Sequence, residues 1–246
     1  MHYIQIAIYL LTAVFIIILL RYLWIMFFID KGYFPEQWKF LVKSDKVSKE
    51  IRELEKYFPD KVRFFNFWFQ AEKIKKDGIK GHFAELGVYK GETAKILHNL
   101  DTNRKLYLFD SFTGFEPKDL EGETGEAATY KQKDFADTSL EKVEKYIDGN
   151  KNIIYRNGHF PKTAKGLEKE IFSLVNIDAD LYNPTKDGLE FFYPRLAPGG
   201  VIIVHDYNHK WEKLMKAVDD FVKTIPETLV EIPDLYGSVM IVKSKF

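Results

Sequence analysis

Acidic residues follow two apolar runs in the C-terminal half of the sequence. Asp178 and Asp180 come after the run SLVNI, and His205 and Asp206 come after the run GVIIV. If both runs are parallel strands of one sheet, their carboxyl ends emerge at the same edge, where open α/β sheets bind ligands. Carboxylates suit hard divalent cations, and histidine is a further ligand type. Asp178, His205 and Asp206 are therefore candidate ligands of one cation, and two unrelated capped strand ends are the alternative.

A turn with two glycines follows an earlier apolar run, in the sequence FAELGVYKGETA from Phe83 to Ala94. Gly87 and Gly91 would let the backbone come close to a ligand. A helix that starts near Thr93 would offer free N–H groups and a positive dipole end to a carboxylate. The glycine spacing is not the G-x-G-x-x-G of dinucleotide sites. A plain strand-turn-helix connection is the alternative.

Another acid, Asp110, follows the apolar run LYLF in the segment LYLFDSF, which extends from Leu106 to Phe112. An acid at the carboxyl end of the second strand can accept hydrogen bonds from ribose hydroxyls, as in nucleotide-binding sheets. Asp110 is therefore a candidate ribose ligand, although an aspartate after a strand is also a common helix cap.

The elements that must position these residues alternate between short apolar runs and longer helical patterns. This alternation predicts an α/β, Rossmann-like fold with a mostly parallel seven-stranded sheet and helices on both faces. The last two runs follow one another without a helix, which predicts a terminal antiparallel hairpin. The predicted helices are 91–100, 138–148, 162–171, 184–195 and 209–224. The polar stretch from Glu116 to Thr138 has the character of a mobile lid.

The N-terminus carries a long apolar segment. Residues 3–20 read YIQIAIYLLTAVFIIILL, and the apolar pattern resumes after Arg21 and continues to Ile29. About 20 such residues in a helix cross the hydrocarbon core of a bilayer, which predicts a single transmembrane helix. A signal peptide would need a basic start and a small-residue cleavage site, and neither is visible. A buried or interfacial helix is the remaining alternative.

Basic residues follow this segment and predict its orientation. Lysines at 31, 39, 43, 46 and 49 outnumber the acids of the same stretch. Excess lysine favours the cytoplasmic side, so we expect the C-terminal domain in the cytoplasm. The predicted domains are a transmembrane anchor (1–30), a connector with a helical segment (31–80) and the α/β domain (81–246).

Residues 46–77 have helical spacing of apolar residues, and the part from Val62 to Phe69 is strongly aromatic. A helix packed on the domain is the first interpretation of this stretch. The alternative is a second patch that contacts a membrane or a partner.

Composition excludes several classes of function. Acidic and basic residues balance at 36 each, so no strong basic field exists to hold nucleic acid. The chain has no cysteine, which rules out a disulfide scaffold, a thiolate nucleophile and a cysteine zinc site. The oligomeric state stays open, a homo-oligomer included.

Taken in order, the segments ELGVYKGETA, LFDSFTGF, NGHFPKT, DADLY and PRLAPGGVIIVHDYN resemble the macrocin O-methyltransferase-like family. The resemblance covers roughly residues 55–243. It implies a class I methyltransferase that uses S-adenosyl-L-methionine and methylates sugar hydroxyls. The implied cofactor-binding residues are Glu85, Gly87, Gly91, Thr93, Asp110 and Ser111.

The same resemblance implies roles for the acids of the later strands. Asp180 matches a proposed general base, and Asp178, His205 and Asp206 match magnesium positions. Members of the family have two acids where this chain has His205 and Asp206. That difference leaves three alternatives open: a weakly held Mg²⁺, another metal, or no metal.

The predicted function is methyl transfer to a hydroxyl, on a sugar of a glycan or of a secondary metabolite. The apolar N-terminal segment favours a lipid-associated acceptor. A catechol-type small-molecule O-methyltransferase is one alternative, and a non-catalytic membrane-anchored binding protein is another.

Overall fold

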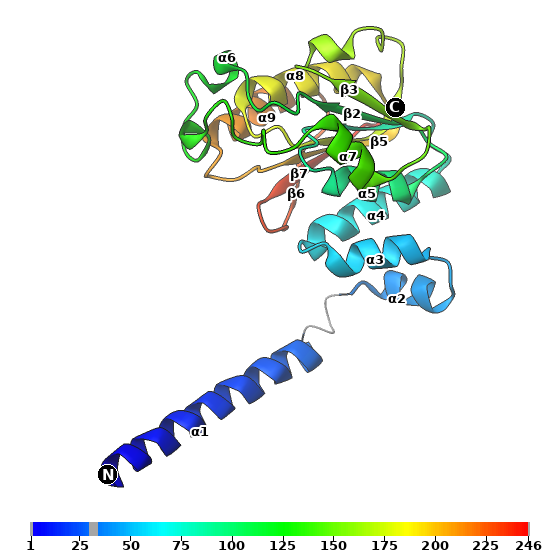
Figure 1. The fold of residues 1–246 in the computed structure, drawn as a ribbon. Coiled ribbons are helices and arrows are strands. Elements are labelled where there is room, and N and C mark those ends of the chain that lie inside the picture. Colours follow the sequence, from blue (N-terminus) through cyan, green and yellow to red (C-terminus); the bar gives the residue numbers. More distant parts are fainter. Residues whose placement is uncertain (1, 30–33, 246) are drawn as a thin grey trace. The chain divides into compact units, whose positions relative to one another are not determined.

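The computed structural model describes residues 2–29 and 34–245, and the chain divides into two compact units, Met1–Arg52 and Glu53–Phe246. The first unit contains the long helix α1 (His2–Trp24), which continues as the π-helix η1 (Ile25–Ile29), and the short helix α2 (Glu36–Lys43) (Figure 1). No residue of α1 is buried, and by length and composition the stretch His2–Phe27 could cross a membrane. Lys31, one of the lysines used to predict orientation, lies outside the described residues.

The second unit is built on a seven-stranded sheet with the order β3-β2-β1-β4-β5-β7-β6. Its strands are β1 (His82–Leu86), β2 (Leu106–Asp110), β3 (Ile153–Asn157), β4 (Phe172–Ile177), β5 (Leu196–His205), β6 (Val230–Ile232) and β7 (Ser238–Val242). β1 to β5 pair in parallel, whereas β7 pairs antiparallel with both β5 and β6. The predicted α/β fold with its terminal antiparallel hairpin is confirmed.

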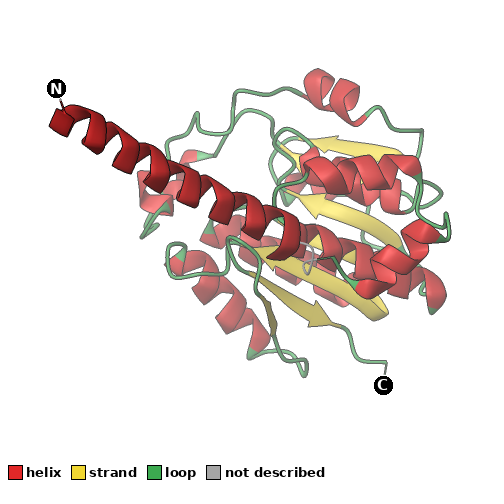
Figure 2. Cartoon of the chain, turned by 90° about the horizontal axis from the view of Figure 1, so that it is seen from below, coloured by secondary structure: helices red, strands yellow, loops and turns green. Residues whose placement is uncertain are grey.

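Helices cover both faces of the sheet because its central strands are apolar on both sides. α4 (Lys61–Lys76), α5 (Glu92–Leu100) and α7 (Leu140–Ile147) lie on one face, and α8 (Tyr182–Phe192) and α9 (Glu212–Val222) lie on the other (Figure 1). Figure 2 shows the strands side by side with helices around them. Every residue of β4 is buried, so this strand runs through the centre of the core.

The aromatic stretch forms the first half of α4, which contacts α5, β4 and β5. Phe64, Phe65, Phe67 and Trp68 are buried, so the prediction of a packed helix is confirmed and these four rings form no exposed patch. The predicted helical region 46–77 is divided into α3 (Lys49–Tyr57) and α4. Pro59 lies between the two helices, where proline cannot continue a helix.

The predicted helix 162–171 is wrong. Only a short 3₁₀ turn, η4 (Lys162–Ala164), forms there, and the chain then runs as loop to β4. The guanidinium of Arg156 donates to the carbonyl oxygens of Thr163 and Lys165, which an α-helix would need for its own N–H groups. Gly166 then adopts a φ of +88°, which a right-handed helix does not allow.

The predicted lid, from Glu116 to Thr138, contains the short helix α6 (Pro117–Leu120) and the 3₁₀ turn η3 (Ala127–Thr129). It is tied to the rest of the unit, because the Glu126 N–H donates to the Lys210 carbonyl at 2.8 Å and the Tyr182 N–H donates to Glu123 Oε1 at 2.8 Å.

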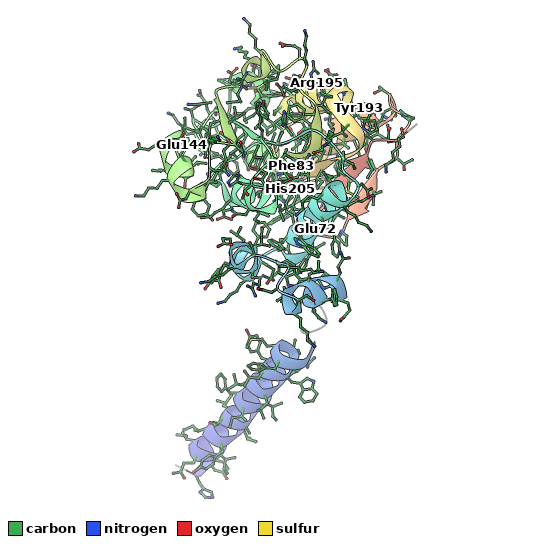
Figure 3. All side chains as sticks on the ribbon, turned by 90° about the vertical axis from the view of Figure 1, so that its right-hand side faces the viewer. Glu72, Phe83, Glu144, Tyr193, Arg195 and His205 are labelled. Atoms are coloured by element: carbon green, nitrogen blue, oxygen red, sulfur yellow. The ribbon has the colours of Figure 1, made fainter. Side chains whose placement is uncertain are left out.

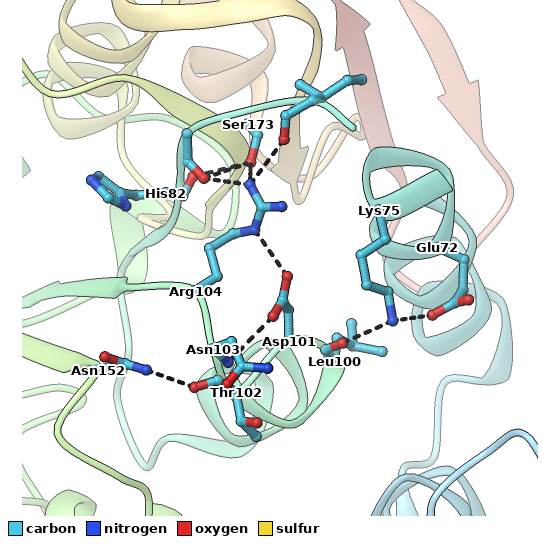
Figure 4. Close-up of polar contacts among 12 residues, drawn as sticks. Glu72, Lys75, His82, Leu100, Asp101, Thr102, Asn103, Arg104, Asn152 and Ser173 are labelled. Carbon is cyan, nitrogen blue, oxygen red and sulfur yellow. Dashed lines mark hydrogen bonds and ion pairs between the residues drawn. The ribbon is translucent and has the colours of Figure 1, made fainter. Parts of the chain in front are cut away.

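Arg104 holds the amino-terminal edge of the sheet together, as Figure 4 shows. Its Nη1 donates to the Ile79 carbonyl at 3.1 Å and to the Gly81 carbonyl, and its Nε contacts Asp101 at 3.0 Å. One half-buried guanidinium therefore donates hydrogen bonds to the carbonyls that enter β1. The candidate site lies at the opposite edge, where the carboxyl ends of the parallel strands meet.

Candidate functional site

A cavity of about 590 Å³ opens at the carboxyl ends of β1, β2, β4 and β5. It is lined by most of the residues that the sequence predicted for the site: Glu85, Gly87, Thr93, Asp110, Ser111, Asp178, Asp180, His205 and Asp206. Gly91 is the exception, since it is not part of the lining. The sheet therefore brings the predicted residues of four strand ends to one place.

Gly87 makes a close approach possible between two strand ends. It has a φ of +86°, and a Cβ atom there would lie 1.8 Å from the carbonyl oxygen of Asp178. The Asp178 N–H donates to the Leu86 carbonyl at 2.8 Å, which fixes this crossing. The prediction attributed the glycine to an approaching ligand, but the nearest neighbour is the chain itself.

Gly91 begins α5. It is the N-cap residue with a φ of +85°, and a Cβ atom there would lie 3.0 Å from Val143 of α7. No side chain caps this helix start, and the first intrahelical bond runs from the Lys95 N–H to the Gly91 carbonyl. The helix therefore presents first-turn N–H groups and its positive end near Thr93, which lines the cavity.

Asp110 organises the loop after β1. Its Oδ2 accepts from the N–H groups of Val88 and Tyr89 at 2.7 and 2.8 Å, and its Oδ1 accepts from the Phe112 N–H at 2.7 Å. A carboxylate has about four lone-pair directions, so about one stays available to a ligand hydroxyl. Ser111 beside it donates from its hydroxyl to the Gly114 carbonyl at 2.8 Å.

Glu85 is a buried carboxyl at the end of β1, with 1% of its surface exposed. Its Oε1 accepts from the amide of Asn176 on β4 at 2.8 Å, whereas its Oε2 has no partner in the part of the chain that the structure describes. Burial, together with the charge of Asp178, raises the pKa of Glu85 well above its ordinary value. A buried acceptor without a donor is unusual and points to a cationic or donor group of a ligand.

The acids of β4 and β5 meet around one histidine. His205 Nδ1 lies 3.1 Å from Asp178 Oδ1 and 3.1 Å from Asp206 Oδ2. Figure 3 shows His205 among the packed side chains of the second unit, whereas Glu144 lies at its edge. Asp180 and Asp206 adopt left-handed backbone conformations, with φ values of 59° and 60°. Three strand-end acids are thus held within one small volume.

Arg63 is the residue of this cluster that the sequence reasoning missed. It comes from α4, its Nη2 donates to Asp178 Oδ2 at 2.7 Å, and its side chain is 10% exposed. The signal was present in the sequence, since Arg63 is the only charged residue in the aromatic run VRFFNFWF. A charge on the buried face of a helix needs a partner, and Asp178 is that partner.

These contacts set the protonation of the cluster. Burial would raise the pKa of Asp178, but the positive charges of Arg63 and His205 hold it below its ordinary range. Burial would lower the pKa of His205, but Asp178 raises it to about 10. Burial and the neighbouring carboxylates of Asp206 and Asp178 raise the pKa of Asp180 well above its ordinary value. The cluster therefore holds two cationic groups of its own.

The predicted metal ligands lie together but do not fit a divalent ion as they stand. Donor atoms of Asp178, His205 and Asp206 all lie within 4.8 Å of one another. However, His205 Nδ1 already contacts both carboxylates, and Arg63 already occupies one oxygen of Asp178. The fixed positive charge of Arg63 beside Asp178 would also repel a divalent ion there.

A second polar cluster lines the same cavity, and sequence reasoning assigned it no role. His159 Nε2 lies 2.6 Å from Asp119 Oδ2, and His159 Nδ1 lies 3.7 Å from Glu116 Oε1. His159 belongs to the segment NGHFPKT after β3, and a histidine at a strand end was the available signal. This cluster adds three more polar side chains to the lining of the cavity.

A comparison with models of protein families shows which family this chain is related to. The family model described as Macrocin-O-methyltransferase (TylF) matches residues 59–238, which include every element that lines the cavity. The chain belongs to this family. The resemblance deduced from the sequence motifs is thereby confirmed.

Two curated members of the family are similar to the chain. An 8-demethyl-8-(2,3-dimethoxy-alpha-L-rhamnosyl)-tetracenomycin-C 4'-O-methyltransferase of Streptomyces olivaceus is 29% identical over 59% of this chain and 60% of its own length. A mycinamicin III 3''-O-methyltransferase of Micromonospora griseorubida is 30% identical over 59% of this chain and 62% of its own length. The chain thus spans about three fifths of the length of these relatives.

Among solved structures, the O-methyltransferase NovP has the same fold. It superposes with a TM-score of 0.65 at 22% identity, covering 75% of this chain and 81% of its own. The second unit is a class I methyltransferase fold.

Proposed function

We propose that this member of the macrocin-O-methyltransferase family transfers a methyl group from S-adenosyl-L-methionine to a hydroxyl of a sugar-containing acceptor. The observation that carries the proposal is the unpartnered, buried Oε2 of Glu85, a residue that lines the same cavity as Thr93 in the uncapped first turn of α5. An acid and a helix N-terminus together suit the ammonium and carboxylate of one amino acid group.

The rest of the cavity suits the nucleoside part of that cofactor. The free lone pair of Asp110 can accept a hydrogen bond from a ribose hydroxyl, and Gly87, Thr93 and Ser111 line the same wall. When bound, S-adenosyl-L-methionine supplies a methyl group on a sulfonium sulfur, which keeps the electron pair as the methyl group leaves.

Asp180, which follows β4, is the general base in this proposal. A neutral hydroxyl is a weak nucleophile, so its proton must leave as its oxygen forms the new bond to carbon. Asp180, in its ionised form, accepts that proton, and its raised pKa makes it a stronger base than an ordinary aspartate. Asp178 and Asp206 hold the acceptor by hydrogen bonds. No step is assigned to a metal ion.

The acceptor class is taken from the relatives. Their names specify a rhamnosyl tetracenomycin and mycinamicin III as substrates of those enzymes. A sugar hydroxyl on a larger molecule is therefore the acceptor that we propose here, and a lipid-linked glycan is one form of it.

We also propose the cellular arrangement and the domain division. Residues 1–30 anchor the chain, 31–80 connect, and 81–246 carry the chemistry. The apolar length of α1 supports the anchor, and the lysine-rich stretch that follows supports a cytoplasmic domain. S-adenosyl-L-methionine is made in the cytosol, which agrees with this orientation.

The test is transfer of labelled methyl groups by the full-length chain. Rhamnosides and other sugar acceptors are compared with catechols, and Asp180→Asn serves as the inactive control. Turnover on sugars alone supports the proposal. Turnover on catechols alone replaces it with a catechol-type enzyme, and cofactor binding without turnover on either acceptor class replaces it with a binding protein.

A further inference from the structure

The position of Arg63 is fixed from three sides. Its backbone N–H donates to Asp60 Oδ1 at 2.9 Å in the cap of α4, and its Cζ lies 5.6 Å from the ring centroid of Phe67. Its Nη2 donates to Asp178 Oδ2 at 2.7 Å. The helix cap fixes the backbone of Arg63, and the ring and the carboxylate hold its guanidinium, so this group is a permanent part of the site.

Arg63 also has unused hydrogen-bonding capacity. It lines the cavity, and its buried Nε–H has no acceptor among the residues that the structure describes. A guanidinium stays charged at every working pH, so Arg63 is a fixed positive charge beside Asp178. A bound divalent cation would balance the charge of Asp178 in the same way.

We propose that Arg63 is the resident cation of this site and takes the place of a divalent metal ion. It pairs with Asp178 and so lowers the net negative charge that would attract a metal ion. Arg63 is a positioning residue, because it holds Asp178 in the orientation that receives the acceptor. The positioning role of Arg63 rests on the proposed methyl transfer. The exclusion of a metal ion by Arg63 does not depend on that proposal.

The proposal predicts the metal affinity of the full-length chain, measured as Mn²⁺ binding by electron paramagnetic resonance. Wild type should leave millimolar Mn²⁺ free in solution. Arg63→Met removes the charge and keeps much of the side-chain length, so it should bind Mn²⁺ at least about tenfold more tightly, because the fixed repulsion is gone. Arg63→Lys keeps a charge and should behave as wild type.

Two controls separate the charge of Arg63 from other effects. Lys61→Met removes a positive charge from the same helix outside the cavity, and it should not create Mn²⁺ binding. Adding Asp178→Asn to Arg63→Met should abolish the binding that the single variant gains.

Stoichiometric Mn²⁺ binding by wild type that Asp178→Asn abolishes overturns the proposal, as does a folded Arg63→Met chain with unchanged affinity; Asp178→Asn separates this site from the Glu116, Asp119 and His159 cluster. If Arg63→Met does not fold, the wild-type and Arg63→Lys measurements still decide, because Mn²⁺ binding at Asp178 by either one contradicts the proposal. Binding of S-adenosylhomocysteine is measured on the same samples. Its absence would contradict the proposed function, while the Mn²⁺ result would still stand for Arg63.

Discussion

The side-chain amide of Asn176 donates to only one oxygen of Glu85, at 2.8 Å, although both residues are buried in adjacent strands. The other oxygen, Oε2, has no partner within the described residues. Asn176 therefore orients the carboxyl without satisfying it. The unsatisfied oxygen is a cost to the free protein that a ligand ammonium can remove.

Replacing Glu85 with Gln should weaken S-adenosylhomocysteine binding about 10-fold to 100-fold, because a hydrogen bond to a charged group contributes about 1.5–3 kcal/mol. Titration calorimetry measures this. Because the pKa of Glu85 is raised in the free protein and an ammonium favours its ionised form, binding should also release a proton. Wild-type heats should then vary with the buffer's ionisation enthalpy, and equal affinities of the two proteins would contradict the assignment.

The same raised pKa predicts how stability depends on pH. Above pH 4.5, the ordinary value for this group, the folded state binds more protons at Glu85 than the unfolded state does. This contribution to the free energy of unfolding therefore falls as pH rises towards the folded pKa. In urea unfolding without ligand, the Glu85→Gln chain should gain stability relative to wild type as pH rises. A difference that does not change with pH would contradict the prediction.

Gly87→Ala should destabilise the second unit by roughly 2–5 kcal/mol, the sum of left-handed strain and overpacking. Its Cβ would lie 1.8 Å from a backbone oxygen of Asp178, which no side-chain rotation can relieve. Gly166→Ala is the matched control, since Gly166 also has a positive φ but has nothing within 4 Å of a Cβ. Urea unfolding should show a loss of only about 1–2 kcal/mol for the control. Equal losses would mean that the close crossing is not rigid.

Asp180→Asn should lower the methylation rate about 10²-fold to 10⁴-fold, the range for loss of a general base. Affinity for S-adenosylhomocysteine should stay within about twofold, because Asp180 is assigned to proton transfer and not to cofactor binding. The base must be ionised, so wild-type activity should fall as pH drops through a value above the ordinary 3.8. Asp187→Asn, on α8 and outside the cavity, should leave the rate unchanged. A fully active Asp180→Asn chain would remove the base assignment.

Charges in the middle of α1 should release the chain from membranes. Ile16→Lys with Ile17→Lys costs about 2.5–3.5 kcal/mol per residue near a bilayer centre. Carbonate extraction of membranes should then recover the variant in the supernatant, whereas wild type should stay in the pellet. The double variant Ile16→Leu with Ile17→Leu keeps the helix apolar and should behave as wild type. Release of wild type would exclude the anchor.

Much of the fold was predictable because its signals are local. Each strand is a short apolar run, and period and spacing were enough to predict a parallel sheet that ends in a hairpin. The helix at 162–171 failed because the contacts that prevent it come from Arg156, on the preceding strand. A hydrogen bond between two elements does not change the spacing of apolar residues in either of them, so this spacing could not predict it.

The residues of the site also fall into those that the sequence predicted and those that it did not. Asp178, His205 and Asp206 were predictable as neighbours because parallel strands must end at one edge. Arg63 was not, because its contact with Asp178 joins residues 115 positions apart and depends on how α4 packs. The roles of Gly87 and Asp110 were only partly predictable. Gly87 also permits the close approach of the Asp178 backbone, and Asp110 also accepts hydrogen bonds from the backbone after β1.

The left-handed backbone at Asp180 and Asp206 limits what evolution can place there. Aspartate, asparagine and glycine enter this conformation most readily, so the chain geometry alone narrows the choice at both positions. An aspartate or asparagine found at either position in a relative is therefore weak evidence that the relative is an enzyme. A descendant of this fold that has lost its chemistry would keep the same residue types, and its sequence would still look active.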